Sequence, residues 1–373
     1  MIYLHIPFCK QKCSYCNFHF STSLKLKDDM LLALKKELHL RHHELENKNL
    51  PSLYFGGGTP SILSVDEIQR LIDEVLRYFT FNSDIEITLE ANPDDLNQSF
   101  LKALSNTPIN RLSIGTQSFF EEDLKLMNRA HSASEAESSI KRAQDTGFEN
   151  ISIDLIYGSP TSNHSLWKES LQKSIELQVP HISSYALTVE PKTALQKWIE
   201  QKKINAPKEE EQLIAFQYLS ETLKANGFEH YEISNFSKPN YHSRHNTAYW
   251  KGLPYLGIGP SAHSYDGQKQ RSWNIANNSL YIKNLAENSL PKETEILSEK
   301  EQFNELIMIG LRTKWGVKYN IINQFSEEIL KPFQKSLETK LSLGVLKLKE
   351  NQLFIPEEHW FMADGIISDL FVV

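Results

Sequence analysis

Short hydrophobic runs alternate with longer amphipathic segments through the first half of the chain. The short runs are typical of β-strands, because each is apolar over only a few residues. They lie at residues 2–6, 53–55, 85–90, 111–115, 151–157 and 182–187. Alternating strands and helices predict parallel strands joined by right-handed crossovers. Six such units predict an α/β fold whose main part, residues 1–230, is an open, partial (β/α)6 barrel of the TIM type.

Two of the amphipathic segments begin with a residue pair that is typical of a helix N-terminus. A serine followed three residues later by a glutamate satisfies free backbone N–H groups reciprocally. Ser64 with Glu67 opens residues 64–79, and Ser132 with Glu135 opens residues 132–146. We therefore expect both segments to be helices that connect strands of the barrel.

The pattern becomes less regular after the sixth strand. A long helix is expected at residues 207–226, which are acidic at first and apolar later. Residues 228–297 are richer in glycine, proline, asparagine and aromatic residues, a composition that favours irregular structure. We therefore expect an irregular segment at residues 231–297 that contains the motif HNTAYW in a loop.

A separate pattern begins at residue 298. One helical segment runs to about residue 313, and another lies at residues 324–343. Residues 345–355 then alternate like a β-hairpin with its turn at Glu350 and Asn351. Two helices followed by a hairpin predict a small winged-helix-like α+β domain at residues 298–373.

Composition and charge narrow the class of protein further. The 373 residues are enough for one large domain and a smaller one. The formal net charge of -7 argues against nucleic acid as a partner, since no broad basic surface is available for phosphates. No apolar run approaches the roughly 20 residues that span a bilayer, and the first residues do not resemble a signal peptide. We therefore expect a cytoplasmic protein that does not bind nucleic acid.

All three cysteines lie close together, directly after the first strand. An odd number in so short a stretch is a poor disulfide framework and a good metal site. Cys9, Cys13 and Cys16 have the spacing C-x3-C-x2-C. Three thiolates can bind three irons of a [4Fe–4S] cluster and leave the fourth iron open to a small molecule. The alternative is a closed zinc site with His19 as the fourth ligand.

Polar and glycine residues stand at the C-terminal ends of the predicted strands, where parallel barrels carry their chemistry. The second strand runs into GGGTP at residues 56–60, whose glycines permit close approach of a ligand to the backbone. The third strand ends at Glu90, the fourth runs on to Gln117, and the fifth carries Asp154. Arg129 could supply a cation for a carboxylate. Together these residues predict one polar ligand in the mouth of the barrel.

These motifs resemble those of the radical SAM superfamily, in which a [4Fe–4S] cluster binds S-adenosylmethionine (SAM). The resemblance includes Tyr15 before the third cysteine and extends over essentially the whole chain. It implies that Cys9, Cys13 and Cys16 hold the cluster. It further implies a SAM site made of Tyr3, Tyr15, Gly57, Gly58, Thr59, Glu90, Gln117, Arg129, Asp154 and Ala186.

Two features distinguish the subfamilies of this group. The oxygen-independent coproporphyrinogen dehydrogenases carry a fourth cysteine where this chain has Phe18. The chain also contains HNTAYW at residues 245–250, which is similar to the HNxxYW motif of the HemW-like heme chaperones. This resemblance implies that His245 is an axial ligand of heme iron, with neighbouring aromatic side chains against the porphyrin. His242 lies three residues earlier and is the alternative ligand.

The resemblance therefore predicts a heme chaperone that holds a [4Fe–4S] cluster, SAM and heme and passes heme to acceptor apoproteins. We assign no catalytic residue. The alternative is a radical SAM oxidoreductase of porphyrin biosynthesis that decarboxylates coproporphyrinogen, and a third interpretation is a zinc-stabilised binding module. A homodimer and transient membrane association are further implications of the resemblance, for which no residue of the sequence gives evidence.

Overall fold

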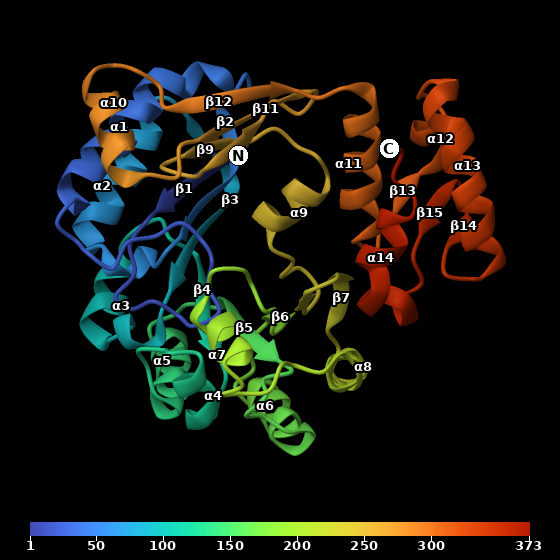
Figure 1. Ribbon diagram of the computed structural model, residues 1–373. Coiled ribbons are helices and arrows are strands. Elements are labelled where there is room, and N and C mark those ends of the chain that lie inside the picture. Colours follow the sequence, from blue (N-terminus) through green and yellow to red (C-terminus); the bar gives the residue numbers. More distant parts are fainter.

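A twisted sheet of parallel strands forms the frame of the protein (Figure 1). The computed structural model describes all 373 residues. The parallel strands are β1 (Ile2–Ile6), β2 (Asn49–Gly57), β3 (Thr80–Ala91), β4 (Arg111–Gln117), β5 (Asn150–Tyr157) and β6 (His181–Ala186). Each pairs with the next along the chain, so the predicted α/β fold with six parallel strands is confirmed.

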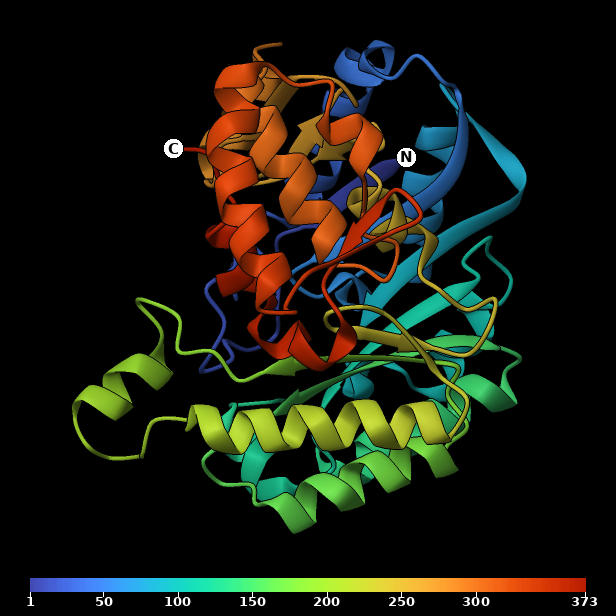
Figure 2. The same ribbon diagram turned by 90° about the vertical axis from the view of Figure 1, so that its right-hand side faces the viewer.

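Helices connect these strands and cover the outer face of the sheet (Figure 1). They are α1 (Lys27–Arg41), α2 (Val65–Leu76), α3 (Gln98–Leu104), α4 (Glu121–Leu126), α5 (Ala133–Asp145), α6 (His164–Glu176), α7 (Ala194–Glu200) and α8 (Glu209–Ala225). Both expected capping boxes are present, with Ser64 before α2 and Ser132 before α5. Helix α7 lies on a segment that extends away from the sheet (Figure 2).

The two faces of the parallel strands differ in polarity because side chains alternate along a strand. Fully buried apolar residues such as Leu53, Ile87 and Leu112 pack beneath the helices. The alternate positions point into the barrel and are polar over several strands. They include Tyr3, Ser52, Tyr54, Glu86, Thr88, Glu90, Arg111, Ser113, Ser152 and Asp154. The barrel interior is therefore a polar space enclosed by an apolar shell.

Residues 228–297 are mostly regular, so the expectation of irregular structure was wrong. They contain β7 (Glu229–Glu232), β8 (Asn235–Ser237), α9 (Arg244–Trp250), β9 (Leu256–Ile258), β10 (His263–Tyr265), β11 (Gln270–Asn274), α10 (Asn278–Ala286) and β12 (Lys292–Ile296). These strands are three to five residues long, too short to show a periodic pattern in the sequence. The HNTAYW motif lies on helix α9, which Ser243 caps, rather than in a loop.

The strands of this segment complete the two edges of the main sheet. The strand order is β7-β8-β6-β5-β4-β3-β2-β1-β9, and β7 does not pair with β9. The barrel is therefore open between these two edges, as the sequence predicts. Strands β10, β11 and β12 form a separate antiparallel sheet.

The C-terminal part is the expected small α+β unit. It consists of α11 (Glu299–Leu311), β13 (Val317–Lys318), α12 (Tyr319–Ile322), α13 (Glu327–Ser342), β14 (Lys347–Lys349), β15 (Gln352–Phe354) and α14 (Ala363–Ser368). The turn of the β14–β15 hairpin holds Glu350 and Asn351, both with positive φ. Phe303 and Phe333 belong to the same buried apolar cluster as Ile2 and Leu4 of β1, so this unit packs as part of one continuous core. No helix is long and apolar enough to cross a membrane.

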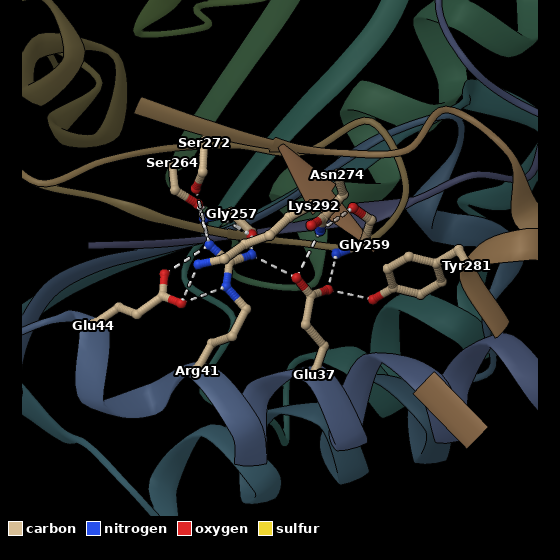
Figure 3. A network of polar contacts seen from close by, with 10 residues as sticks. All are labelled: Glu37, Arg41, Glu44, Gly257, Gly259, Ser264, Ser272, Asn274, Tyr281 and Lys292. Atoms are coloured by element: carbon tan, nitrogen blue, oxygen red, sulfur yellow. Dashed lines mark hydrogen bonds and ion pairs between the residues drawn. The ribbon is translucent and has the colours of Figure 1, made fainter. Parts of the chain in front are cut away.

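A buried polar network attaches α1 to the antiparallel sheet and to α10 (Figure 3). Glu37 and Arg41, one turn apart on α1, form an ion pair at 2.6 Å. Arg41 also donates to the carbonyl of Gly257 and to the hydroxyls of Ser264 and Ser272. Because the partners come from β9, β10 and β11, this network fixes the second half of the chain against the outside of the barrel.

Candidate functional site

One cavity of about 820 Å³ opens at the C-terminal end of the parallel strands. Every site residue expected from the sequence lines it, namely Tyr3, Cys9, Cys13, Tyr15, Cys16, Gly57, Gly58, Thr59, Glu90, Gln117, Arg129, Asp154, Ala186 and His245. Ligand sites of this volume accept molecules of cofactor size. The cysteines, the strand ends and the HNTAYW motif therefore belong to one site, although they are spread over 237 positions between residues 9 and 245.

The cysteine loop is held in place by the segment between α4 and α5. Ser14 donates its backbone N–H to the carbonyl of Met127 at 3.0 Å and its hydroxyl to the carbonyl of Leu126 at 2.7 Å. Gln11 donates to the side chain and the carbonyl of Asn128, both at 2.9 Å. These contacts fix the path of the loop between its first and last cysteines.

The thiols of the loop are partly buried and free. Burial raises the pKa of the Cys9 thiol to about 11, and it also raises the pKa of Cys16. The Arg129 guanidinium donates to the Cys13 sulfur at 3.3 Å. Thiols with raised pKa values lose their protons when a metal binds, because coordination stabilises the thiolate.

His19 does not join the cysteines. Its Nε2 bonds to Asn278 Oδ1 of α10 at 2.7 Å, and its carbonyl bonds to the ring of His5. No set of three or more histidine, cysteine or carboxylate side chains is gathered closely enough to enclose a metal ion. His19 is therefore engaged by α10 and by His5 rather than by the cysteines.

The glycine run lies directly against the start of the cysteine loop. Gly57 has a φ of +106°, which L side chains rarely adopt. A Cβ on Gly58 would lie 2.5 Å from the Phe8 carbonyl oxygen, so only glycine fits there. The backbone N–H of Thr59 donates to that same carbonyl at 2.7 Å. Bare backbone therefore lines the cavity between the first two strands.

Two half-buried carboxylates face the cavity from β3 and β5. Glu90 accepts hydrogen bonds from the Tyr54 hydroxyl at 2.9 Å and from the Gly57 N–H at 3.2 Å. Asp154 accepts one from Ser113 at 3.5 Å. Burial raises the pKa of Glu90 to about 7 and that of Asp154 to about 6. Both groups therefore gain from a ligand that donates hydrogen bonds or carries positive charge.

Arg129 supplies the opposite charge at the rim of the carboxylate pair. Its Nη2 donates to Asn92 Oδ1 and to the Gly115 carbonyl, both at 2.7 Å, while Nε has no partner. Gly115 leaves room for this approach, because a Cβ there would lie 3.0 Å from Nη2. Gln117 ends β4 with a φ of +63°, which turns the chain at the cavity wall. An anionic group of a ligand would find a fixed guanidinium here.

The inner end of the cavity is aromatic and contains His245. The ring is 1% exposed and lies 4.9 Å from the Tyr54 ring. Its Nδ1 bonds to Ser52 Oγ at 2.9 Å, and its Nε2 bonds to the Tyr249 hydroxyl at 3.0 Å. Burial holds the pKa of His245 well below its usual range, so the imidazole is neutral. A neutral, hydrogen-bonded imidazole is the form that binds transition metals.

His242 lies outside the cavity. It stacks on Tyr231 with ring centres 4.3 Å apart, meets the edge of Trp315, and bonds to Glu229 at 3.2 Å. Burial lowers its pKa. The two histidines, three positions apart in the sequence, thus face different environments.

Sequence reasoning missed several residues that line the cavity. Tyr54, Asn92 and Ser113 all contact site residues named above. Tyr54 stands two positions before the glycine run, and Ser113 stands two positions before Gly115. The alternation of inward and outward side chains could therefore have identified them once the strands were placed.

The chain matches the family model of the radical SAM superfamily over residues 3–173. It is 32% identical over 370 residues to heme chaperone HemW of Bacillus subtilis (strain 168), which covers 98% of this chain and 97% of that protein. Heme chaperone HemW of Lactococcus lactis subsp. lactis (strain IL1403) is 34% identical over 334 residues, or 89% of this chain and 86% of the relative. The mitochondrial radical S-adenosyl methionine domain-containing protein 1 of Danio rerio is 31% identical over 336 residues, or 88% of this chain and 76% of the relative.

A solved structure shows the same fold over the whole chain. Coproporphyrinogen III oxidase (HemN) from Escherichia coli, a radical SAM enzyme, superposes with a TM-score of 0.85. The match covers 100% of this chain and 89% of that chain at 24% sequence identity, which shows the fold alone. From the family model and the nearly full-length relatives, the chain belongs to the radical SAM superfamily and, within it, to the HemW family.

Proposed function

We propose that this protein is a heme chaperone of the radical SAM type, which binds a [4Fe–4S] cluster, SAM and heme and transfers heme to acceptor apoproteins. The observation that carries the proposal is the single cavity that brings three cysteine thiols, a set of polar strand ends and His245 together. The names of the HemW relatives support the same function. Cytoplasmic location is an expectation from the apolar pattern of the sequence, whereas a homodimer and transient membrane association are expectations that follow from the resemblance.

Cys9, Cys13 and Cys16 would hold the cluster. Their number fits a cluster with one iron free of protein ligands, and all three line the cavity in which a ligand of that iron would lie. When bound, the cluster supplies an open coordination position and an electron. The chain contributes the Arg129 guanidinium, whose hydrogen bond to Cys13 stabilises negative charge on that sulfur.

SAM would bind between the glycine run and the two half-buried carboxylates. The backbone at Gly57 and Gly58 lets the ligand approach closely. Glu90 and Asp154 are suited to accept hydrogen bonds from its hydroxyl and amino groups. Arg129 is suited to a carboxylate. Tyr3, Tyr15, Thr59, Gln117 and Ala186 complete the proposed lining.

Heme iron would bind to His245. For this its Nδ1–H donates to Ser52 Oγ, which leaves the lone pair of Nε2 for the metal. In the structure the Tyr249 hydroxyl bonds to Nε2 and would be displaced when iron binds. Tyr3, Tyr54 and Tyr249 surround the imidazole with aromatic rings suited to a porphyrin.

The second candidate function is the oxidative decarboxylation of coproporphyrinogen. The fold shared with HemN over the whole chain is the observation that favours it. Phe18 argues against it, because the resemblance places a fourth cysteine there in the dehydrogenases. The Phe18 side chain is 72% exposed and lines the cavity mouth, where it offers no ligand to iron.

One preparation can test these functions together. Protein reconstituted without oxygen should contain about four irons and four sulfides per chain. It should bind heme with a Soret band that is lost in His245→Ala and kept in His242→Ala, while the cluster remains in both. It should not decarboxylate coproporphyrinogen. One tightly bound zinc without sulfide would overturn the cluster, and robust SAM-dependent decarboxylation would replace the chaperone with the enzyme.

A further inference from the structure

A buried arginine outside the proposed ligand set lies beneath the floor of the cavity. Arg111 is the first residue of β4, and its side chain is 1% exposed. It points into the barrel, beside Thr88 of β3 and Asn150 of β5 in the strand register. The next inward residue of β4 is Ser113, which lines the cavity and donates to Asp154. Arg111 therefore lies one layer below the proposed SAM site.

The guanidinium of Arg111 has no hydrogen-bonded partner at two of its nitrogens, Nε and Nη1. Its closest carboxylate is Glu86, whose Oε2 lies 3.9 Å from Nε. The two Glu86 oxygens instead accept the backbone N–H groups of Arg244 and His245 at 3.0 and 3.1 Å. A buried charge without close partners destabilises a folded protein, so this arginine adds little to stability by local bonding.

The charge of Arg111 acts on the carboxylates of the cavity. Burial raises the pKa of Asp154, and Arg111 is the strongest influence in the opposite direction. Burial also raises the pKa of Glu90, and Arg111 again opposes it, more weakly than the hydrogen bonds of Tyr54 and Gly57 do. Coulombic attraction acts across several ångströms in a buried site, so no direct contact is needed.

Several other groups face Asp154 from the elements packed around it. Ser113 of β4 donates to the carboxylate, Ser183 of β6 is the strand neighbour of Asp154, and Arg129 adds a second positive charge. Glu90 of β3 and the phenols of Tyr54 and Tyr185 interact with Asp154 as further acidic groups. Among these groups only the two arginines bring positive charge, and Arg129 already bonds to Asn92, Gly115 and Cys13.

We infer that Arg111 is a positioning residue for SAM binding, whose guanidinium has only a distant ion pair with Glu86 and keeps the Asp154 carboxylate ionised without touching the ligand. The inference rests on the proposed function only in that SAM binds in this cavity. Its effect differs from that of a structural residue, because it depends on pH. Without the guanidinium, Asp154 takes up its proton at a higher pH, so affinity is lost near neutrality and recovered in alkali.

The test is calorimetric titration of SAM into reconstituted, cluster-containing protein between pH 6.5 and 8.5. Arg111→Met should bind SAM about tenfold more weakly than wild type at pH 6.5 and less than about twofold more weakly at pH 8.5. The titration of SAM itself cancels, because each variant is compared with wild type at the same pH. The SAM affinity of Arg111→Lys should stay closer to that of wild type at every pH, because lysine keeps the positive charge. Arg142→Met, which removes a partly buried guanidinium from α5 on the outside of the barrel, should not change the pH profile.

A double mutant shows whether Arg111 acts through Asp154. In an Asp154→Asn background, Arg111→Met should weaken SAM binding at pH 6.5 by clearly less than it does in the wild-type background, because the asparagine cannot titrate and only the weaker influence of Arg111 on Glu90 remains. Equal loss of affinity at all pH values, or an unchanged loss in the double mutant, overturns the inference. If Arg111→Met fails to fold, Arg111→Gln takes its place in both comparisons. Wild-type protein that holds its cluster but does not bind SAM contradicts the proposed function itself.

Discussion

The protein buries charged side chains both under α1 and inside the barrel, and these two regions differ in how fully the charges are hydrogen-bonded. Under α1, the Glu37 carboxylate accepts hydrogen bonds from Arg41, Gly259, Asn274 and Tyr281 (Figure 3). All three nitrogens of the Arg41 guanidinium donate. Inside the barrel, two nitrogens of Arg111 have no partner.

The unpartnered atoms of the barrel interior lie beside one another. Thr88 Oγ1, Arg111 Nε and Nη1, and Asn150 Oδ1 all lack partners, and these residues are neighbours in the register of β3, β4 and β5. The network under α1 contains one such atom, Asn274 Oδ1. A fully bonded network stabilises the fold, whereas free polar groups destabilise it. The α1 network is therefore satisfied almost entirely by protein groups, whereas the barrel interior leaves polar groups without protein partners.

The largest expected effect is on the α1 network. Glu37→Ala leaves Arg41 buried without its partner and should lower the free energy of unfolding by about 3–5 kcal/mol. Denaturation in urea measures this change. The matched control is Glu327→Ala, which breaks a helical ion pair with Lys331 that is exposed to solvent and should have little effect. A loss no larger than that of the control would contradict the structural role of the network.

Removing a carboxylate charge inside the barrel should lower the affinity for the ligand rather than the stability of the fold. Glu90→Gln and Asp154→Asn should each weaken SAM binding about ten- to hundredfold, because each removes a charged acceptor worth about 1.5–3 kcal/mol. Calorimetric titration of cluster-containing protein at pH 8 measures this. Unchanged affinity in both variants would mean that the SAM site is placed wrongly.

These two variants should also be more stable than wild type in alkali. The pKa of Glu90 is raised to about 7 and that of Asp154 to about 6, chiefly by burial. The folded state therefore binds protons more tightly than the unfolded state, and the free energy of unfolding falls as pH rises from about 4 to about 7. The amides do not titrate. The difference in free energy of unfolding between each variant and wild type should therefore shift in favour of the variant by on the order of 1–3 kcal/mol between pH 4.5 and pH 8. If the free energy of unfolding of ligand-free variant and wild type changed with pH in the same way, this prediction would be wrong.

His245 combines features of both regions, since it is fully bonded and also lines the cavity. Tyr249→Phe removes the hydroxyl from Nε2 and should increase heme affinity by about two- to tenfold, because the iron then displaces no hydrogen bond. Ser52→Ala removes the partner of Nδ1 and should decrease heme affinity by about tenfold. Soret titrations measure both changes. If Tyr249→Phe binds heme more weakly, the hydroxyl is part of the heme site rather than a group that heme displaces.

The sequence predicts the parallel strands and the strand-end residues because both depend on local pattern. Strands β1 to β6 are apolar runs, and a parallel barrel gathers their C-terminal ends at one mouth. The spacing of the cysteines predicts a metal site in this loop, and the resemblance adds the cluster. The pattern of the sequence is therefore enough to predict that Glu90 and Asp154 lie near Cys9.

The environment of His245 could not be expected, because it depends on contacts between distant segments. Its partner Ser52 lies 193 positions away, and Glu86 fixes the start of α9 from 159 positions away. The strands β7 to β12 are also too short to show a period. Arg111 looks like an ordinary strand residue in the sequence, and only the register shows that its charge lies beneath the cavity.

The smallest expected change in the free energy of unfolding comes from a comparison of one buried hydroxyl in each region. Ser264 Oγ accepts from Arg41 at 3.0 Å and from the Gly257 N–H at 2.9 Å, so Ser264→Ala leaves two buried donors without this acceptor and should cost about 1–3 kcal/mol. Thr88 Oγ1 is buried and has no partner, so Thr88→Val replaces an unbonded hydroxyl with a methyl group of similar size. It should leave the free energy of unfolding within about 0.5 kcal/mol of wild type, or raise it slightly. Urea denaturation of the ligand-free variants under one set of conditions makes the comparison. Should Thr88→Val destabilise the protein as much as Ser264→Ala does, the barrel interior would be bonded as fully as the α1 network, and the distinction between the two regions would fail.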